Sequence, residues 1–254
     1  MPLVRPPTRP VPLLGALLVA LAAACGGEAA APPEGQTDEA ATAGTVEAAV
    51  HTRCSTLAVR GLSEQLVAEI ACIAPGSLAS IEALDGVTLD DEVFPYLQQS
   101  AATALAKAAR ASKTTIEIKS ALRTTPQQFL LRRWYETKRC GIDLAAPVGA
   151  SNHEQGLAVD AMGGRSRALV AAGFHWFGSG DAVHHDFSAG GDVDLTGLST
   201  KAFQRLWNRN HPDQPLPEDG TYSRATELRL KQAPATGFDL GASCAPEGPP
   251  DAGP

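Results

Sequence analysis

Two histidines and one aspartate, His153, Asp160 and His184, are spaced so that they can bind a metal ion together. Two imidazoles and one carboxylate give zinc three ligands and leave a fourth position for water, which distinguishes catalytic zinc from closed structural zinc. A lone histidine is more often structural, and we interpret His175 and His211 in that way. The combination of His153, Asp160 and His184 instead predicts a catalytic zinc site.

Strand alternation decides between the adjacent histidines His184 and His185. The segment 182–187 has the pattern of a strand, and side chains on a strand alternate between its two faces. His185 then shares a face with apolar Val183 and Phe187, whereas His184 points away from them. We therefore assign His184 to the metal and His185 to the wall of the site or to a position behind the ligands.

A zinc hydrolase also needs a base that takes a proton from water and returns it to the leaving amine. Asp181 precedes His184 by three residues and can reach the bound water without being a ligand itself. Glu154 is the alternative base because it adjoins His153. Adjacent side chains on an extended chain point apart, so Asp181 is the preferred base.

The elements that must position these residues alternate without a regular repeat. Helical spacing of apolar residues predicts helices over 91–109, 127–134 and 166–172, and a period of two predicts strands over 115–119, 156–162 and 182–187. A strand thus leads Arg123 into a turn that precedes a helix. Because helices and strands mix without a βαβ repeat, the predicted fold class is α+β.

Three separated motifs occur in order along residues 115–187. They are Ser-x-x-Arg-Thr at 120–124 with Gln128 five residues after the arginine, Ser-x-His-x-x-Gly-x-Ala-x-Asp at 151–160, and Asp-x-x-His at 181–184. Together they resemble the VanY-like zinc D,D-carboxypeptidases, whose fold is shared with the Hedgehog signalling domain and some phage L-alanyl-D-glutamate endopeptidases. The resemblance implies a small antiparallel sheet flanked by helices, and zinc bound by the three residues named first above.

The resemblance also implies roles for the residues around the metal. Asp181 would act as the base, and Arg123 would bind a substrate carbonyl or carboxylate and stabilise the oxyanion, with Gln128 and Ser151 in support. A fixed guanidinium fork suits both tasks, although an ordinary surface ion pair is the alternative for Arg123. Two departures are His185, where the family usually has Phe or Trp, and Asp181, where it often has Glu. The implied substrates are peptidoglycan stem peptides.

The N-terminal segment 1–25 has the pattern of an export signal. Arg5 and Arg9 precede an apolar run over 11–24, which Cys25 follows. The run is short for a membrane span, which needs about 20 apolar residues. The segment resembles a bacterial lipoprotein processing site and predicts a lipid anchor on Cys25 in the cell envelope, on the periplasmic or the outer-surface side. Ordinary signal cleavage with an incidental cysteine is the alternative.

The other four cysteines, an even number in an exported chain, predict two disulfides. Three pairings are possible, and the sequence alone does not choose between them. A thiolate zinc site is less favoured because the chain has no Cys-x-x-Cys pair. The residues concerned are Cys54, Cys72, Cys140 and Cys244.

Composition divides the chain into a signal peptide (1–25), a disordered tether (26–53), a zinc peptidase domain (54–190), a helical appendage (191–244) and a disordered tail (245–254). The appendage resembles a half-length peptidoglycan-binding repeat, and a plain pair of packing helices is the alternative. A net charge of -7 without a basic cluster argues against nucleic-acid binding. We expect a monomer.

Two other functions stay open beside a D,D-carboxypeptidase. One is an L-Ala-D-Glu or L,D-type endopeptidase, and the other is a non-catalytic, cell-wall-binding lipoprotein, because this kind of fold need not be an enzyme. The presence of every expected ligand together with an acidic residue for the base favours catalysis. Binding of wall fragments without cleavage would instead favour the binding protein.

Overall fold

The computed structural model describes residues 44–244, so the predicted signal peptide, Cys25 and the tail at 245–254 lie outside the described residues. The described chain is α+β, as predicted. None of its helices has the length and apolar character needed to cross a membrane. Its helices and 3-10 turns are α2 (Val46–Thr52), η1 (Thr56–Val59), α3 (Arg60–Ile73), α4 (Gln99–Ala111), α5 (Thr125–Glu136), α6 (Arg167–Ala171), η2 (Ser179–Asp181), α7 (Leu198–Asn210) and α8 (Arg224–Gln232).

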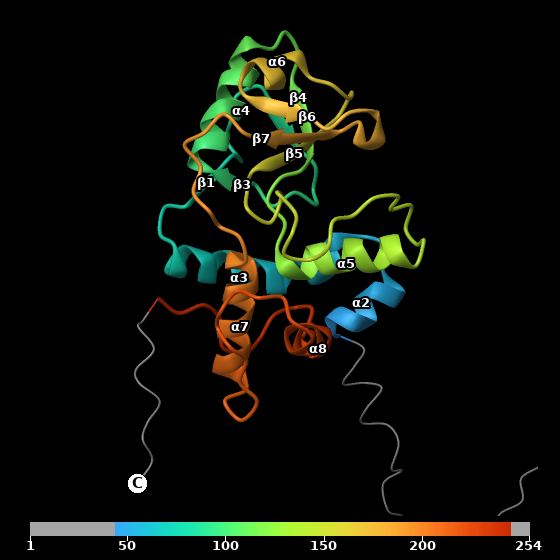
Figure 1. The fold of residues 1–254 in the computed structure, drawn as a ribbon, viewed down its shortest axis with the longest axis vertical. Coiled ribbons are helices and arrows are strands. Elements are labelled where there is room, and N and C mark those ends of the chain that lie inside the picture. The colour runs from blue at the N-terminus through green and yellow to red at the C-terminus, as the bar shows by residue number, and fades with distance from the viewer. Residues whose placement is uncertain (1–43, 245–254) are drawn as a thin grey trace, which may run out of the picture. The chain divides into compact units, whose positions relative to one another are not determined.

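The strands form two sheets (Figure 1). The larger one has the order β2-β4-β5-β7-β6, and the smaller one pairs β1 with β3. The β2–β4 pair is parallel and the other pairs are antiparallel, so the expected antiparallel sheet is in fact mixed. The chain between β2 and β4 includes α4, which supplies the crossover that parallel neighbours need. The strands are β1 (Leu78–Ser80), β2 (Val87–Leu89), β3 (Tyr96–Gln98), β4 (Ile116–Ser120), β5 (Ala158–Ala161), β6 (Phe174–Trp176) and β7 (His184–Phe187).

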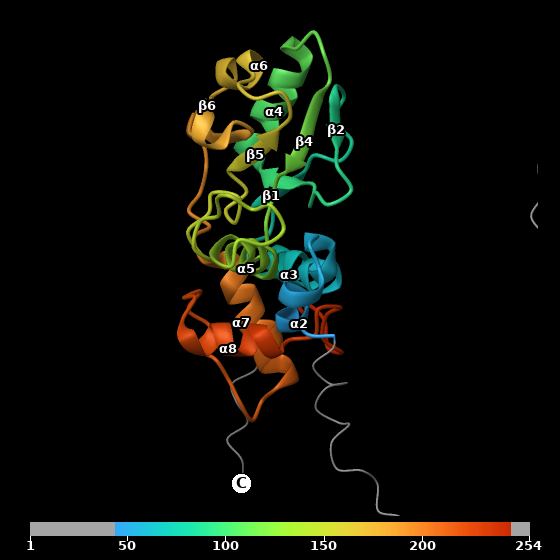
Figure 2. The same cartoon turned by 90° about the vertical axis from the view of Figure 1, so that its right-hand side faces the viewer.

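One face of the larger sheet packs against α4 and α6 (Figure 2). Ile118 of β4 and Val159 of β5 are fully buried there against Leu105 of α4 and Leu169 of α6. Because side chains alternate along a strand, the neighbours of these apolar residues point to the opposite face. That opposite face therefore carries the polar residues of β5 and β7.

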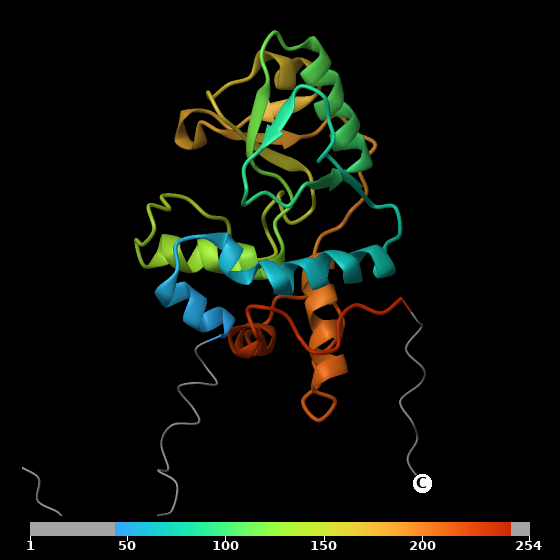
Figure 3. The ribbon, with the colours of Figure 1, turned by 180° about the vertical axis from the view of Figure 1, so that it is seen from behind.

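A second core joins α2, α3, α5, α7 and α8. In Figures 1 and 3, α3 and α5 lie between the larger sheet and the helices α7 and α8. Val46 and Val50 of α2 are buried in this core, so the last residues of the expected tether (26–53) form a packed helix. Leu206 of α7 and Leu230 of α8 are buried in the same core, so the helices of the segment 191–244 pack directly against α2, α3 and α5.

The four described cysteines form two disulfides, as their number predicted. The pairs are Cys54–Cys140 and Cys72–Cys244, and their partners are 86 and 172 residues apart in the sequence. The first ties the chain after α2 to the chain after α5, and the second ties α3 to the C-terminal end of the described residues. Both bridges therefore close long loops, the geometry in which a crosslink most restricts the unfolded chain.

A buried ion pair joins α3 to α7. Glu69 is fully buried, and its carboxylate lies 2.9 Å from Nε of Arg205 and 3.2 Å from Nη1 of Arg209. A buried carboxylate without such partners would be strongly destabilising. The charges of α7 are thus matched to α3, which supports the conclusion that α7 belongs to the main fold.

We expect Leu206→Ala to lower the free energy of unfolding by about 2–5 kcal/mol, because it leaves a cavity in the helical core. Leu228→Ala on α8 is the control, since Leu228 is 50% exposed and its truncation should change stability by less than about 0.5 kcal/mol. Urea denaturation followed by circular dichroism would measure both. If unfolding occurred in two separate transitions and Leu206→Ala shifted only one of them, α7 and α8 would form an independent unit.

Candidate metal centre

The register between β5 and β7 places Asp160 beside His184. These residues are directly opposite each other in the antiparallel pair, and Ala158 is opposite Asp186. Val159 belongs to the core under α4 and α6, so Asp160 and its cross-strand partner point to the other face of the sheet. Strand pairing alone thus brings a carboxylate and an imidazole together from residues far apart in the sequence.

His153 reaches the same point from the loop before β5. Its carbonyl oxygen accepts a hydrogen bond from the backbone N–H of Arg123 at 3.1 Å, and its ring Nδ1 lies 2.7 Å from the carbonyl oxygen of Ala121. Gly156 allows this loop to turn with a φ of +67°, and a Cβ there would lie 3.0 Å from the backbone nitrogen of Gln98. The loop therefore holds the buried His153 ring against the end of β4.

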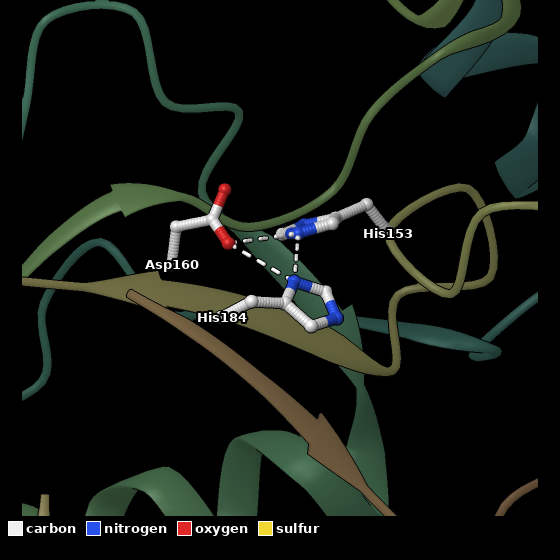
Figure 4. Close-up of side chains that lie close together, drawn as sticks. All are labelled: His153, Asp160 and His184. Atoms are coloured by element: carbon white, nitrogen blue, oxygen red, sulfur yellow. Dashed lines mark hydrogen bonds and ion pairs between the residues drawn. The ribbon is translucent and has the colours of Figure 1, made fainter. Parts of the chain in front are cut away.

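The three predicted ligands converge on one point (Figure 4). His153 Nε2 lies 3.2 Å from Asp160 Oδ1 and 3.1 Å from His184 Nδ1, and the latter two atoms are 3.1 Å apart. Ligand atoms on a tetrahedral zinc ion at its usual bond lengths are about 3.3 Å apart. The three side chains therefore have the donor types and the spacing of a site for a divalent metal ion.

Each histidine presents the nitrogen that a metal needs. A carbonyl oxygen can only accept, so His153 Nδ1 donates its hydrogen to Ala121 and Nε2 is left with a lone pair. His184 Nε2 donates in the same way to Asp186 Oδ1 at 2.8 Å, which turns Nδ1 toward Asp160. Outer partners of this kind commonly fix the tautomer and orientation of metal-binding histidines.

The electrostatics of the cluster favour bound positive charge. Burial lowers the pKa of His153, which keeps its ring neutral. Burial opposes ionisation of Asp160, but its interactions with the polar His153 ring and the Arg123 guanidinium outweigh burial and hold the pKa of Asp160 well below its usual range. Burial also disfavours charge on His184, yet hydrogen bonds to Asp160 and Asp186 raise the pKa of His184 to about 9. Without a metal ion, a proton on His184 supplies the positive charge.

Arg123 is fixed beside the ligands. Its Nη2 donates to Asp160 Oδ2, the oxygen that faces away from the histidines, and its Nε donates to Ser120 Oγ at 2.8 Å. A guanidinium has five N–H donors, so these bonds leave three for another acceptor. The Arg123 side chain is 19% exposed. It is therefore held in place next to the metal donors and still open to a ligand.

The cluster opens into a hollow of about 370 Å³. The predicted residues that line this hollow are Arg123, Ser151, His153, Asp181 and His184. Asp181 is partly exposed at the end of η2. The structure thus gathers the predicted base, the predicted arginine and two of the ligands around one cavity, with Asp160 reaching the same point from β5.

Two residues considered from the sequence support the wall of this hollow. Gln128 is fully buried and donates its side-chain N–H to the carbonyl oxygen of Ala146 at 2.9 Å. Glu154, the alternative base, accepts hydrogen bonds from the backbone N–H groups of Gly149 and Ser151 at 2.8 and 3.4 Å. Burial raises the pKa of Glu154 to about 7. Neither residue is among those that line the hollow.

His185 is a structural histidine on the other face of the sheet, behind the ligands. It is fully buried, its Nδ1 donates to the carbonyl oxygen of Val183 at 2.8 Å, and its Nε2 accepts from the backbone N–H of Ser166 at 3.2 Å. Both ring nitrogens are satisfied, so His185 anchors the start of α6.

Sequence reasoning missed Asp186 and Phe177. Asp186 accepts from His184 and also from Asn152 Nδ2 at 2.9 Å, and strand alternation placed it on the metal face all along. Phe177 is 54% exposed, and its ring meets His184 edge-on with the centroids 5.6 Å apart. No periodic signal in the sequence indicated Phe177, because it lies between strands.

We expect the protein to bind one equivalent of a divalent transition metal ion, and His184→Ala to weaken this binding by more than about 100-fold, since loss of an outer partner alone costs 10–100-fold. His175→Ala is the matched control, because His175 is exposed on the neighbouring strand β6. Isothermal titration calorimetry with zinc would measure both affinities. Wild-type affinity in His184→Ala would rule out the predicted centre.

The Asp186 carboxylate should contribute to metal affinity without contacting the metal. We expect Asp186→Ala to weaken zinc binding by about 10–100-fold, because it removes the acceptor that holds the His184 ring. Asp192→Ala, at an exposed acid in the loop after β7, is the control. Equal affinities of the two variants would show that the His184–Asp186 hydrogen bond has no role in metal binding.

Comparisons with known proteins identified no relative of this chain, so the centre is interpreted from its geometry. No family model matches the chain, and neither the curated proteins nor the solved structures gave a match. The described chain is α+β, and its residues His153, Asp160 and His184 form a group able to hold a metal ion.

Proposed function

We propose that this chain is a zinc peptidase that hydrolyses a peptide bond next to a D-amino acid in peptidoglycan stem peptides. The convergence of His153, Asp160 and His184 beside an open hollow with Asp181 on its wall is the observation that carries the proposal. The motif resemblance to the VanY-like zinc D,D-carboxypeptidases supplies the substrate class. Two disulfides support an oxidising location, consistent with an exported chain anchored through Cys25 in the bacterial envelope.

The donor set supports zinc as the metal. Two imidazole nitrogens and one carboxylate oxygen are common zinc ligands, and three protein ligands leave a coordination position for water or substrate. A zinc ion bound there would act as a Lewis acid toward a substrate carbonyl and would lower the pKa of water. The hollow beside the donors gives a peptide access to that position.

The protein's own residues would divide the remaining work. Arg123 would donate hydrogen bonds to the oxygen of the scissile carbonyl, where negative charge develops during attack, and its bonds to Asp160 and Ser120 fix it in advance. Asp181 would accept a proton from the attacking water as the water oxygen bonds to the carbonyl carbon. The same carboxyl group would give that proton to the amine nitrogen as the carbon–nitrogen bond breaks.

Asp181 is the acid best suited to this transfer. Asp186 is engaged by His184 and Asn152, and Glu154 is engaged by backbone N–H groups. The Asp181 carboxylate makes no hydrogen bond or ion pair with other residues of the described range 44–244, and Asp181 lines the hollow next to the metal donors. A base must be free to exchange protons with water, so the unengaged carboxylate is the preferred one.

We expect Asp181→Ala to keep zinc affinity and to lose about 10²–10⁴-fold in turnover, the usual contribution of a positioned acid or base. Asp192→Ala should retain both properties, because Asp192 lies outside the hollow. Release of D-alanine from a stem pentapeptide, followed by mass spectrometry with and without a chelator, measures the activity. Wild-type turnover in Asp181→Ala would reject this base, and binding of the peptide by the wild-type protein without any cleavage would favour a wall-binding protein.

A further inference from the structure

The hollow contains a second guanidinium that the proposed mechanism does not use. Arg132 lies on α5, eight residues after the N-cap Thr124, and its side chain is 30% exposed. It lines the hollow together with Tyr135 and Leu144, whereas the metal donors line it from β7 and the loop before β5. A cation on the wall of a candidate active site attracts negatively charged groups of a ligand and so affects which ligands bind.

Arg132 is held in place by its neighbours. Its Nη1 donates to the carbonyl oxygen of Ala145 at 3.0 Å, and its Nε donates to Glu136 Oε1 at 2.8 Å. Its guanidinium carbon lies 5.2 Å from the centroid of the Tyr135 ring. Two of its five N–H donors are used by these bonds, so three are left for an acceptor. A fixed planar fork of this kind matches the geometry of a carboxylate.

The charge of Arg132 is only partly compensated. Glu136 is shared, because its Oε2 also accepts from Arg133 Nη1 at 2.8 Å, so one carboxylate faces two guanidinium groups. The hollow is also lined by the carboxylates Asp181 and Asp186. The hollow therefore has a cation contributed by α5 and carboxylates contributed by η2 and β7, so a charged ligand interacts differently with these elements.

We propose that Arg132 binds the C-terminal carboxylate of the substrate, while Arg123 binds the scissile carbonyl. This assignment rests on the proposed peptidase function and specifies its substrate as a peptide with a free C-terminus. One residue spans about 3.5 Å, so a carboxylate one residue beyond the scissile carbonyl stays within a hollow of about 370 Å³. Leu144 and Phe177, which are 50% and 54% exposed on its walls, provide apolar contact for a small side chain.

The assignment separates an exopeptidase from an endopeptidase. An endopeptidase cleaves within a chain that continues on both sides, and it meets a carboxylate next to the scissile bond only where the following residue is acidic, as in an L-Ala-D-Glu bond. An exopeptidase that removes the last residue meets a carboxylate there in every substrate, and charge-assisted hydrogen bonds to it are about twice as strong as neutral ones. Arg132 thus fits the carboxypeptidase form of the proposed function, and probes that differ only in the terminal carboxylate distinguish it from recognition of an acidic side chain.

Arg132→Gln tests the assignment, with Arg133→Gln as a matched control. Both variants remove one guanidinium from Glu136, but Arg133 does not line the hollow. The probes are two stem peptides that are identical except that one ends in a carboxylate and the other in a carboxamide. The measurements are kcat/KM with zinc present and, independently, the Kd of each peptide for the metal-free protein by calorimetry.

The wild-type protein and Arg133→Gln should prefer the carboxylate peptide by about tenfold or more in both measurements, the effect of a hydrogen bond to a charged group. Arg132→Gln should lose this preference while its zinc affinity is unchanged. The assignment is overturned if Arg132→Gln keeps the preference, or if the wild-type protein never had it. If the wild-type protein cleaves neither peptide, the proposed function fails, and the Kd values still decide whether Arg132 binds a carboxylate.

Discussion

Three donor atoms with lone pairs cannot lie within 3.2 Å of one another unless positive charge is shared between them, and this constraint governs the structure around His153, Asp160 and His184. Without a metal ion, a proton on His184 supplies this positive charge. A bound divalent metal ion would supply more of it. The hydrogen-bond partners of the three residues all help to direct the donor atoms toward this shared charge. Ala121 and Asp186 turn the ring nitrogens inward, and Arg123 holds the outer oxygen of Asp160.

The two cores of the protein supply this geometry from different directions. The core between the larger sheet and α4 fixes the register of β5 and β7, and through it the pairing of Asp160 with His184. The helical core fixes α5, whose side chains Gln128 and Arg132 hold the carbonyl oxygens of Ala146 and Ala145 in the opposite wall. The hollow is therefore lined both by residues of α5, which the helical core holds, and by residues of β7, which the core under the larger sheet holds.

The sequence predicts more of the candidate site than of the fold around it. Strand alternation separated His184 from His185, and the structure places them on opposite faces of the sheet. The same rule could have indicated Asp186. The parallel pairing of β2 with β4 and the burial of α7 depend on contacts between segments distant in the sequence. The local spacing of apolar residues does not predict such contacts. The helix α2 was missed because its alanines resemble those of the tether, and only Val46 and Val50 mark its buried face.

The connectivity of the two disulfides has a consequence for how the chain matures. The pairs interleave, since Cys72 lies between Cys54 and Cys140, and Cys140 lies between Cys72 and Cys244. A chain that emerges from its N-terminus exposes Cys54 and Cys72 first, and these two are not partners. Oxidation in order of appearance would join them and trap an incorrect crosslink, so the native pattern requires either delayed oxidation or thiol–disulfide exchange after the last helices have docked.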